Sequence, residues 1–577
     1  MENITIYERD ISYIQSTEGL DNTVYVPGYA ITGPVNTPTL CYSLSEFQNI
    51  FGIVPYTFEN NQEYKNLSGF GLSTGNFKMK NEQELSYIYA CELLNQGLPV
   101  LFERVMSDTK TTKFIYSANI DSNGSLQIKS KYPGRYGNSI TYKLENTDNA
   151  NTYKLTVIQS AQYKSNLIGS DSKPVSITYR NSDITIPIEF STDVASDKYF
   201  GNLETDIIEF VWDNETIGTI TPTTDEKSLE NAQLTDSVYE FEVIDLYNKM
   251  IQGYDSSTNK YSEGYLFTKL QDKGEYDIKY ITAGGYPVFD YSNNIITKIM
   301  LHTASVRGNS VAIIDYLNNI GENKKYKKLE GMSSSDQSLQ YAVNTNLSGT
   351  GEEFFVILDS SRKEDIRTYG TMFVPYIQYL SQVYNKNYVM ASSFDYLMCV
   401  ATSLTNRNSK WYAIAGVQRG IAPNVKGLST NVTGAISSAL ELEDGISINP
   451  ITNIKPYGYT IWNDMTLRKN NSTEGFVATS LLSVRCLACD VKSVVWKAAR
   501  KFMFEPMSDI LWVNFKSEIE PTLDKMQSGN VLRKYEIKRI NTTEKSKIKA
   551  LIRLYVIDPI KSFDITLELS DSYVDVE

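Results

Sequence analysis

Apolar residues in the first hundred positions follow the pattern of an α/β unit. The stretch 22–35 is typical of a buried strand broken by Gly and Pro, and a helix with Gly52 as its cap is expected at 43–51. A second helix is expected near 83–94, ahead of a strand at 98–105. This order of strand, helix, helix and strand predicts an α/β layer architecture.

The amino-acid composition of the chain changes between about 107 and 281. Thr, Ser, Asn, Asp and Tyr dominate there, and short alternating runs such as 140–144 and 152–158 predict exposed strands. We therefore expect an inserted, mostly β domain. The apolar runs 311–315 and 353–359 then predict buried strands of the parallel type, so the chain returns to its α/β core.

The C-terminal part predicts two helices and three strands. A long helix runs through Arg500, a second helix spans about 508–526 and ends at Gly529, and the last strand, 563–569, alternates apolar and polar residues without a break. The predicted fold class is multidomain, α/β and α+β, with exchanged terminal strands. The expected division is an arm at 1–20, a core domain in two parts at 21–106 and 282–474, an inserted outer domain at 107–281 and a C-terminal α+β domain at 475–577.

Composition narrows the classes of protein that fit this chain. It has 577 residues, a formal net charge of -13 and a single histidine, which argues against nucleic-acid binding because such proteins usually carry a basic surface. We find no apolar run long enough to span a bilayer and no pattern of a secretory signal at the start. We therefore expect no membrane insertion, and folding in a cytoplasm.

Each candidate for catalytic or metal chemistry has a simpler structural interpretation. Cys486 and Cys489 lie in a stretch with helical apolar spacing and have no second Cys or His pair that could complete a zinc site. The glycine-rich stretch 69–75 lacks the features that hold phosphate, and 119–130 lacks the carboxylate that a calcium loop needs at its twelfth position. His302 has no nucleophile pattern around it, so we expect no enzyme activity, no metal and no cofactor.

Short segments in a fixed order carry the functional signal. The most informative is 410–423, in which Trp411 precedes a Gly-Val-Gln-Arg-Gly run. The others are 4–12, 33–38 with 47–52, 132–140, 306–315, 458–466, 504–506 with Leu511 and Trp512, and 559–563. As an ordered set, these segments resemble the tail sheath proteins of contractile-tailed bacteriophages and related injection machines.

The resemblance covers roughly the first hundred residues and the second half of the chain, and it finds no match between Asn146 and Tyr280. Two departures from the family are Asn463-Asp464, where Gly-Ala is more common, and the absence of a long Pro-rich stretch before Trp411. The resemblance implies structural positions, and no catalytic ones, for Gly33, Pro34, Gly137, Asn138, Trp411, Gly416, Arg419, Gly420, Trp462, Phe504, Glu505, Pro506 and Trp512.

The resemblance also implies a function. Copies of such a chain stack into a helical array around an inner tail tube, and the array shortens and widens to drive the tube through the host envelope for genome delivery. The implied location is the tail of a virion that assembles in the host cytoplasm. The implied partners are further copies of the chain, the inner tube protein, and baseplate and terminator or neck proteins.

Two terminal segments are expected to link the copies. Short apolar-polar strands at the ends of a chain bury little surface within their own domain, whereas donation to a neighbour's sheet edge would satisfy their backbone groups. The residues expected to lie in these arms are Ile4, Ile6, Tyr7 and Ile11 near the N-terminus, and Phe563, Ile565, Leu567 and Leu569 near the C-terminus.

Charge is distributed unevenly along the chain. The segment 491–561 contains fifteen Lys and Arg and eight Asp and Glu, so the rest of the chain has a formal net charge of about -20. One interpretation is a solvated helix face. The hypothesis that we favour is a basic inner face against an acidic tube, formed by Lys492, Lys497, Lys516 and Lys525.

Two other classes of protein remain as alternatives. A tail-associated or surface adhesin that binds a receptor would also be rich in Tyr, Asn and Thr, although it would more often be a compact trimer without detachable arms. A cytoplasmic enzyme would require convergent catalytic groups, which this sequence does not show. Electron microscopy separates the three classes, because only a sheath subunit forms long tubes.

Overall fold

The structure is a computed structural model of the 577-residue chain. It describes residues 22–53, 73–74, 77–78 and 85–557, apart from 150, 169–173, 233, 235–239, 256–257, 259, 290–293, 317–338, 348, 351, 360–361, 408–410, 422, 443, 472–476 and 541–547. Both predicted arms and the glycine-rich stretch 69–75, except for Ser73 and Thr74, lie outside the described residues.

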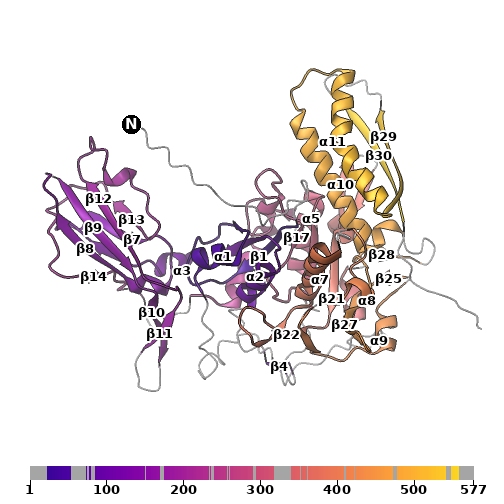
Figure 1. The fold of residues 1–577 in the computed structure, drawn as a ribbon, viewed down its shortest axis with the longest axis horizontal. Helices are drawn as coiled ribbons and strands as arrows, with labels where there is room; N and C mark the ends of the chain where they lie inside the picture. Colours follow the sequence, from indigo (N-terminus) through magenta and orange to yellow (C-terminus); the bar gives the residue numbers. More distant parts are fainter. Residues whose placement is uncertain are drawn as a thin grey trace, which may run out of the picture.

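A mixed sheet of eight strands forms the centre of the molecule (Figure 1). Its order is β2-β5-β1-β17-β18-β21-β26-β27; the six strands from β5 to β26 pair in parallel, and β2 and β27 add antiparallel edges. The strands are β1 (Val24–Gly28), β2 (Thr39–Cys41), β5 (Val100–Arg104), β17 (Tyr280–Ile281), β18 (Val311–Asp315), β21 (Gly370–Val374), β26 (Asn449–Ile454) and β27 (Gly458–Ile461).

The continuous apolar runs of the sequence explain this sheet. Every residue of β1, β5, β18 and β21 is buried, as expected for strands of a parallel sheet that is covered on both faces. The predicted strands at 22–35, 98–105 and 311–315 are confirmed as β1, β5 and β18. The two predicted helices are confirmed as α1 (Leu44–Phe51), which Gly52 caps with φ 78°, and α2 (Leu85–Asn95).

One strand prediction in this part is wrong. The run at 353–359 forms β19 (Phe355–Asp359), which pairs antiparallel with β20 (Arg362–Asp365) in a separate two-stranded sheet. The two strands are only two residues apart, and a gap of that length closes a hairpin instead of a crossover to a parallel neighbour. The parallel position beside β18 belongs to β21.

The inserted region forms two small antiparallel sheets and a hairpin that project from one side of the core (Figure 1). The sheets have the orders β12-β9-β8-β14 and β13-β7-β6, and the alternating runs at 140–144 and 152–158 are confirmed as β8 and β9. The strands are β6 (Ser117–Asn119), β7 (Leu126–Ser130), β8 (Ile140–Asn146), β9 (Thr152–Gln159), β10 (Gln162–Ile168), β11 (Pro174–Thr178), β12 (Ile184–Ser191), β13 (Ile208–Trp212) and β14 (Lys227–Ser228).

The expected end of the insertion at 281 needs a correction. Tyr280 and Ile281 form β17, which lies between β1 and β18 in the middle of the core sheet. A strand of two residues has no periodicity from which the sequence could reveal it. The remaining domain boundaries stay predictions.

The C-terminal region packs two long helices against a two-stranded sheet (Figure 1). It comprises α10 (Leu482–Lys501), α11 (Asp509–Ser528), β29 (Leu532–Ile540) and β30 (Lys549–Val556). Their apolar faces form a small core of their own, with Leu487, Ile519 and Leu523 at its centre. The two predicted helices are confirmed, and the Ser508 hydroxyl caps α11 by accepting from the Leu511 N–H at 3.1 Å. The predicted strand 563–569 lies outside the described residues.

The remaining helices and small sheets complete the core and its connections. None of the described helices is long and apolar enough to cross a membrane. The remaining elements are β3 (Ser73–Thr74), β4 (Phe77–Lys78), α3 (Asp108–Lys113), η3 (Arg135–Ser139), η4 (Phe200–Asn202), α4 (Val243–Ile251), β15 (Tyr254–Asp255), β16 (Lys260–Tyr261), η5 (Thr268–Gln271), α5 (Ile295–Arg307), α6 (Leu339–Leu347), η6 (Glu352–Phe354), η7 (Ile366–Tyr369), β22 (Ile377–Leu380), β23 (Asn387–Met390), α7 (Ser392–Arg407), α8 (Gly416–Arg419), β24 (Val425–Leu428), α9 (Gly434–Ala439), β25 (Gly445–Ile446), β28 (Lys469–Asn470) and η8 (Ala478–Ser480).

Candidate functional site

The chain packs closely at the point where open α/β sheets usually bind ligands. This point lies at the carboxyl ends of β1 and β17, where the strand order reverses. The Ser86 hydroxyl of α2 accepts from the Tyr29 N–H there at 3.2 Å, and both residues are buried. A Cβ on Gly28 would collide with Ser86, and one on Gly284 would collide with the Pro27 carbonyl. The two glycines therefore allow a close approach of the chain at this point.

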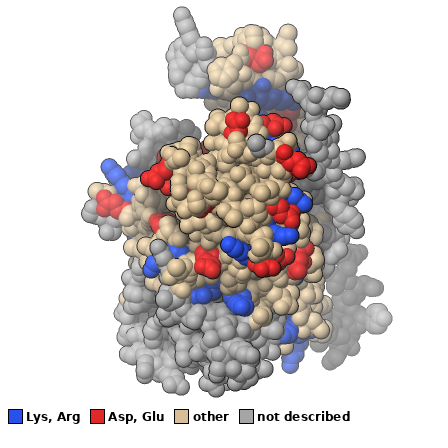
Figure 2. All heavy atoms as spheres, turned by 90° about the vertical axis from the view of Figure 1, so that its left-hand side faces the viewer, with Lys and Arg blue, Asp and Glu red and all other residues tan. Residues whose placement is uncertain are grey.

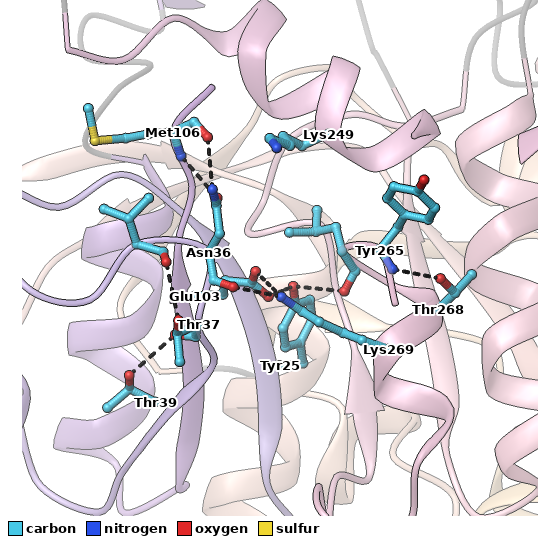
Figure 3. Close-up of polar contacts among 12 residues, drawn as sticks. Tyr25, Asn36, Thr37, Thr39, Glu103, Met106, Lys249, Tyr265, Thr268 and Lys269 are labelled. Atoms are coloured by element: carbon cyan, nitrogen blue, oxygen red, sulfur yellow. Dashed lines mark hydrogen bonds and ion pairs between the residues drawn. The ribbon is translucent and has the colours of Figure 1, made fainter. Parts of the chain in front are cut away.

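Buried charges in the core have structural partners. Glu103, at the end of β5, is fully buried and accepts from the Tyr25 hydroxyl at 2.6 Å (Figure 3). The Lys269 ammonium of η5 lies between the Glu103 carboxylate and the Asn36 carbonyl, to which it donates at 3.0 Å. Burial raises the pKa of Glu103, and the charge of Lys269 opposes that rise. This cluster joins η5 to the sheet and leaves none of its groups open to a substrate.

The candidate motifs for chemistry have structural roles where the structure describes them. Cys486 and Cys489 are buried free thiols on α10, and burial raises the pKa of Cys486 to about 12, so neither is an activated nucleophile. The Asp121 carboxylate accepts from the N–H groups of Leu126 and Gly218 at 3.0 and 2.7 Å, which closes a turn. His302 stacks on Tyr261 with 4.1 Å between ring centroids.

No cluster of three metal-ligating side chains occurs among the described residues. A small cavity of about 20 Å³ lies between α7, α10 and the segment around Trp411, and a volume of that size holds about one water molecule.

A buried ion pair fastens α10 to the core sheet. The Lys279 ammonium, directly before β17, pairs with the Asp490 carboxylate and donates to the Cys486 carbonyl at 2.7 Å. The second oxygen of Asp490 accepts from the Trp411 indole N–H at 2.9 Å. Burial alone would lower the pKa of Lys279, but the Asp490 charge raises it above its usual value. The Trp411 motif thus lies at the junction of core and C-terminal domain.

Further contacts strengthen the same junction. The Arg485 guanidinium lies 4.1 Å from the Tyr369 ring centroid and donates to the Thr368 hydroxyl at 2.7 Å. Lys492, two turns further along α10, also contacts the Tyr369 ring and lies 3.6 Å from the Glu364 carboxylate. These residues make the first half of α10 part of the core.

The four lysines that were predicted to face a tube do not share one surface. Lys492 and Lys497 have carboxylate partners in the core, at 3.6 Å from Glu364 and 2.6 Å from Asp277. Lys516 and Lys525 lie on α11, nine residues apart, and therefore point to opposite sides of that helix. Lys516 pairs with Glu520 at 2.9 Å, and Lys525 is exposed near the end of the helix. Their role toward a tube stays a prediction.

The glycine motifs mark close packing near the core surface. Gly33 has φ 97°, and a Cβ there would lie 2.7 Å from the Phe51 ring; the half-buried Pro34 follows it. A Cβ on Gly137 would collide with Tyr116. The Asn138 amide holds Lys164 of β10 by donating to its carbonyl at 2.7 Å and accepting from its N–H at 3.0 Å.

The residues after Trp411 form a tight turn beside β27. Gly416 has φ 70°, and a Cβ on Gly420 would lie 2.7 Å from the Ile461 carbonyl oxygen. The Arg419 guanidinium lies 4.9 Å from the Tyr412 ring centroid. Trp462 follows β27 and is 48% exposed.

The tip between α10 and α11 is apolar and exposed. Phe504 is 99% exposed with φ 70°, a backbone conformation that is strained for an aromatic residue, and exposed Glu505 and Pro506 follow it. Trp512 is half-buried and packs on Phe515 with 5.8 Å between ring centroids. The other exposed apolar side chains are Met503, Met507, Ile510 and Val513, at 60, 52, 73 and 61%. The resemblance marked Phe504, but no pattern in the sequence indicates that its neighbours form one apolar tip.

The sheet of β29 and β30 is open at both edges. The two strands pair only with each other among the described strands, so each has one edge without a strand partner. Ile537, Ile552 and Leu554 pack on the helices, whereas Glu536 lies on the other face with Lys534 at 2.8 Å. Open edges of this length are able to accept a further strand.

No protein-family model and no curated protein sequence matches the chain. Solved structures of sheath proteins do match its fold. A sheath tail protein from Listeria innocua is 8% identical, with a TM-score of 0.48 and 93% of this chain and 96% of that chain covered. One from Desulfitobacterium hafniense is 12% identical, with a TM-score of 0.43 and 93% and 97% covered. The contracted sheath complex of an extracellular contractile injection system is 16% identical, with a TM-score of 0.35 and 57% and 80% covered.

These structures are of sheath proteins, the class of protein that the ordered sequence motifs resemble. At such identities and TM-scores the likeness assigns no function to this chain. The function has to be argued from its own residues.

Proposed function

We propose that this chain is a structural tail sheath subunit that polymerises into a helical array around an inner tube. The observation that carries the proposal is the β29–β30 sheet, whose outer edges have no partner among the described strands, in a chain that also has two strand-like terminal arms by sequence. A chain with both a donor strand and an acceptor edge polymerises without closing when the donor goes to a neighbour.

Strand donation would link the copies while each keeps its own fold. The N-terminal arm contains Ile4, Ile6, Tyr7 and Ile11, and the C-terminal arm contains Phe563, Ile565, Leu567 and Leu569. A two-stranded sheet is marginal alone, and a third strand would extend its hydrogen-bonded ladder. In this proposal, the arm of a neighbour would add a third strand at an edge of the β29–β30 sheet of the C-terminal domain.

In the proposed mechanism, contraction shortens and widens this array and drives the tube through the host envelope for genome delivery. New contacts between copies would supply the free energy for this change. The apolar tip around Phe504 would contribute one such contact. The partners would be the tube, baseplate and terminator proteins, and the location the tail of a virion that is assembled in the host cytoplasm.

Within this proposal the C-terminal domain faces the tube. Its excess of basic residues would complement an acidic tube surface. Lys516 and Lys525 lie on opposite sides of α11, so at most one of them would contact the tube in a given orientation of this helix.

Electron microscopy of the purified chain tests the proposal. The intact chain should form long tubes or polysheaths, and deletion of 1–12 or of the residues from 562 should leave a folded monomer that forms none. A sharper variant is Ile565→Asp with Leu567→Asp, which alters one face of the last strand. Its matched control is Asp564→Asn with Thr566→Ser on the opposite face, which should still form tubes. Truncated chains that polymerise like the intact chain would show that strand exchange is wrong.

A further inference from the structure

A basic seam runs between α10 and the loop that precedes β17. We define it as Lys273, Arg307, Lys492, Lys497 and Arg500. The Lys492 side chain lies 3.7 Å from the position that a Cβ on Gly308 would take, and an Arg500 guanidinium nitrogen lies 3.3 Å from the corresponding position on Gly274. Burial and the nearby charges of Arg307 and Lys492 lower the pKa of Lys273. Cations from three separate segments thus crowd together here.

The carboxylates of this region balance only part of the charge. Asp277 pairs with Lys497 at 2.6 Å, and Glu364 lies 3.6 Å from Lys492. Asp272 uses a carboxylate oxygen to accept from the Gly274 N–H at 2.7 Å, within its own loop. Among the described residues, neither Lys273 nor Arg500 has a carboxylate within the 4.0 Å of an ion pair.

Arg307 is a buried cation behind the seam. Its guanidinium donates to the carbonyls of Leu270 and Tyr276, the latter at 2.7 Å, and to the Ser310 hydroxyl at 2.7 Å. The charges of Asp277 and Asp272 offset part of its own charge. The seam therefore presents two cations, Lys273 and Arg500, without an ion-pair partner in the described part of the chain.

The chain itself carries a segment of the complementary chemistry. Residues 570–577 have the sequence Ser-Asp-Ser-Tyr-Val-Asp-Val-Glu, with three carboxylates and no cation. They follow 563–569 directly, which is the strand that the proposed function gives to a neighbour. From Ile557, the thirteen residues to Ser570 extend about 45 Å at most, enough to cross between adjacent domains.

We propose that the seam binds the acidic segment 570–577 of a second copy of this chain. This inference rests on the proposed function, because the donated strand brings that segment to the C-terminal domain of the neighbour. The seam lies along α10, and apolar residues of the same helix share a cluster with residues of β29 and β30. Asp571, Asp575 and Glu577 would then face Lys273 and Arg500. The contact ties the arm to the neighbour's core as well as to its sheet.

Disulfide formation between full-length chains tests this contact. The five natural cysteines are all buried, so an introduced cysteine is the accessible one. One preparation carries Lys273→Cys and the other Asp575→Cys, and the two are mixed under mild oxidation. We expect a disulfide-linked dimer between them. The matched control replaces the first chain with Val194→Cys, which is 73% exposed but lies on the insertion.

The electrostatic part of the contact has its own readout. Adding Arg500→Glu to the Lys273→Cys chain should lower the dimer yield about fivefold, since one exposed pair becomes repulsive. Adding Asp571→Lys to the Asp575→Cys chain should restore the yield. Raising the salt concentration should lower the yield of the unreversed pair.

The outcomes separate this inference from the proposed function. Tubes that form while the seam pair yields no more dimer than the control would overturn the seam contact and leave the sheath function standing. A disulfide that forms only within one chain carrying both cysteines would also overturn it. Dimers at the seam without tubes would support the contact and count against the sheath function. Neither dimers nor tubes would refute both.

Discussion

Asp490→Asn is the sharpest test of how the core and the C-terminal domain are joined. The side chains of Lys279 and Asp490 are only 4% and 7% exposed, and Asp490 also accepts from the Trp411 indole. Asparagine keeps the shape of the side chain and an acceptor oxygen but removes the charge. Lys279 then becomes a buried cation whose remaining partner is the Cys486 carbonyl.

The expected cost is large because the partner charge stays buried. Breaking a buried ion pair by removing one partner costs about 3–5 kcal/mol of unfolding free energy, a large share of the roughly 5–15 kcal/mol that holds most domains folded. Removing both charges with Lys279→Met and Asp490→Leu should recover most of this loss, because no uncompensated charge remains. The matched control is Lys501→Met on the same helix. Its pair with Glu518 is 61% and 41% exposed, so the loss should be under about 1 kcal/mol.

Urea unfolding followed by circular dichroism and tryptophan fluorescence measures these differences. Because the C-terminal domain has its own apolar cluster, we expect the Asp490→Asn curve to separate into two steps, with the C-terminal domain unfolding first. A single transition with a loss no larger than that of Lys501→Met would refute the reasoning. It would mean that Lys279 finds water or another acceptor once the carboxylate is gone.

Two further predictions concern pH and the insertion. Burial lowers the pKa of His302 to about 4, below the value near 6.5 in the unfolded chain, so the folded state favours the neutral ring. Because the unfolded chain binds the proton first, the free energy of unfolding should fall by about 2 kcal/mol from pH 7 to pH 5. His302→Gln should remove that part of the slope in urea midpoints measured at both pH values, and an unchanged slope would contradict it. Deleting 117–230 should spare tube formation, because Ser117 and Glu230 are bridged and a short linker can join their neighbours. Loss of folding on this deletion would place the region in the core. On the face that carries the insertion, Lys, Arg, Asp and Glu are scattered around an uncharged centre (Figure 2), so the described part of that face shows charges of both signs.

Local patterns in the sequence predicted the elements that local physics determines. The apolar run at Val311–Asp315 could only be a buried strand, and Ser508 and Gly529 marked the ends of α11 because capping residues act on their own turn. The run at Phe355–Asp359 was misassigned because its apolar content suits a hairpin strand as well as a parallel one. The parallel position beside β18 is taken by β21, a pairing that lies outside the run itself.

Contacts between distant segments had no signal in the sequence. Lys279 and Asp490 are 211 residues apart, and neither has a neighbour that indicates pairing. For the same reason the sequence grouped Lys492 with the other lysines by charge alone, whereas Glu364 and Tyr369 of the core hold it in place. Net charge is a property of composition, but the direction in which a charge points depends on tertiary packing.

The C-terminal domain is strongly joined to the core at one end and incomplete at the other. At the base of α10, the charges of Lys279 and Asp490 are matched and desolvated, which fixes the helix to the core sheet. At the far end, Phe504 is held in a strained, exposed conformation, and among the described strands nothing pairs with the outer edges of β29 and β30. Strain and unpaired edges cost free energy in an isolated chain, and contacts with another copy can offset that cost. The domain thus keeps its internal geometry and leaves its unsatisfied surface for contacts between copies, which is the division of roles that a polymerising subunit requires.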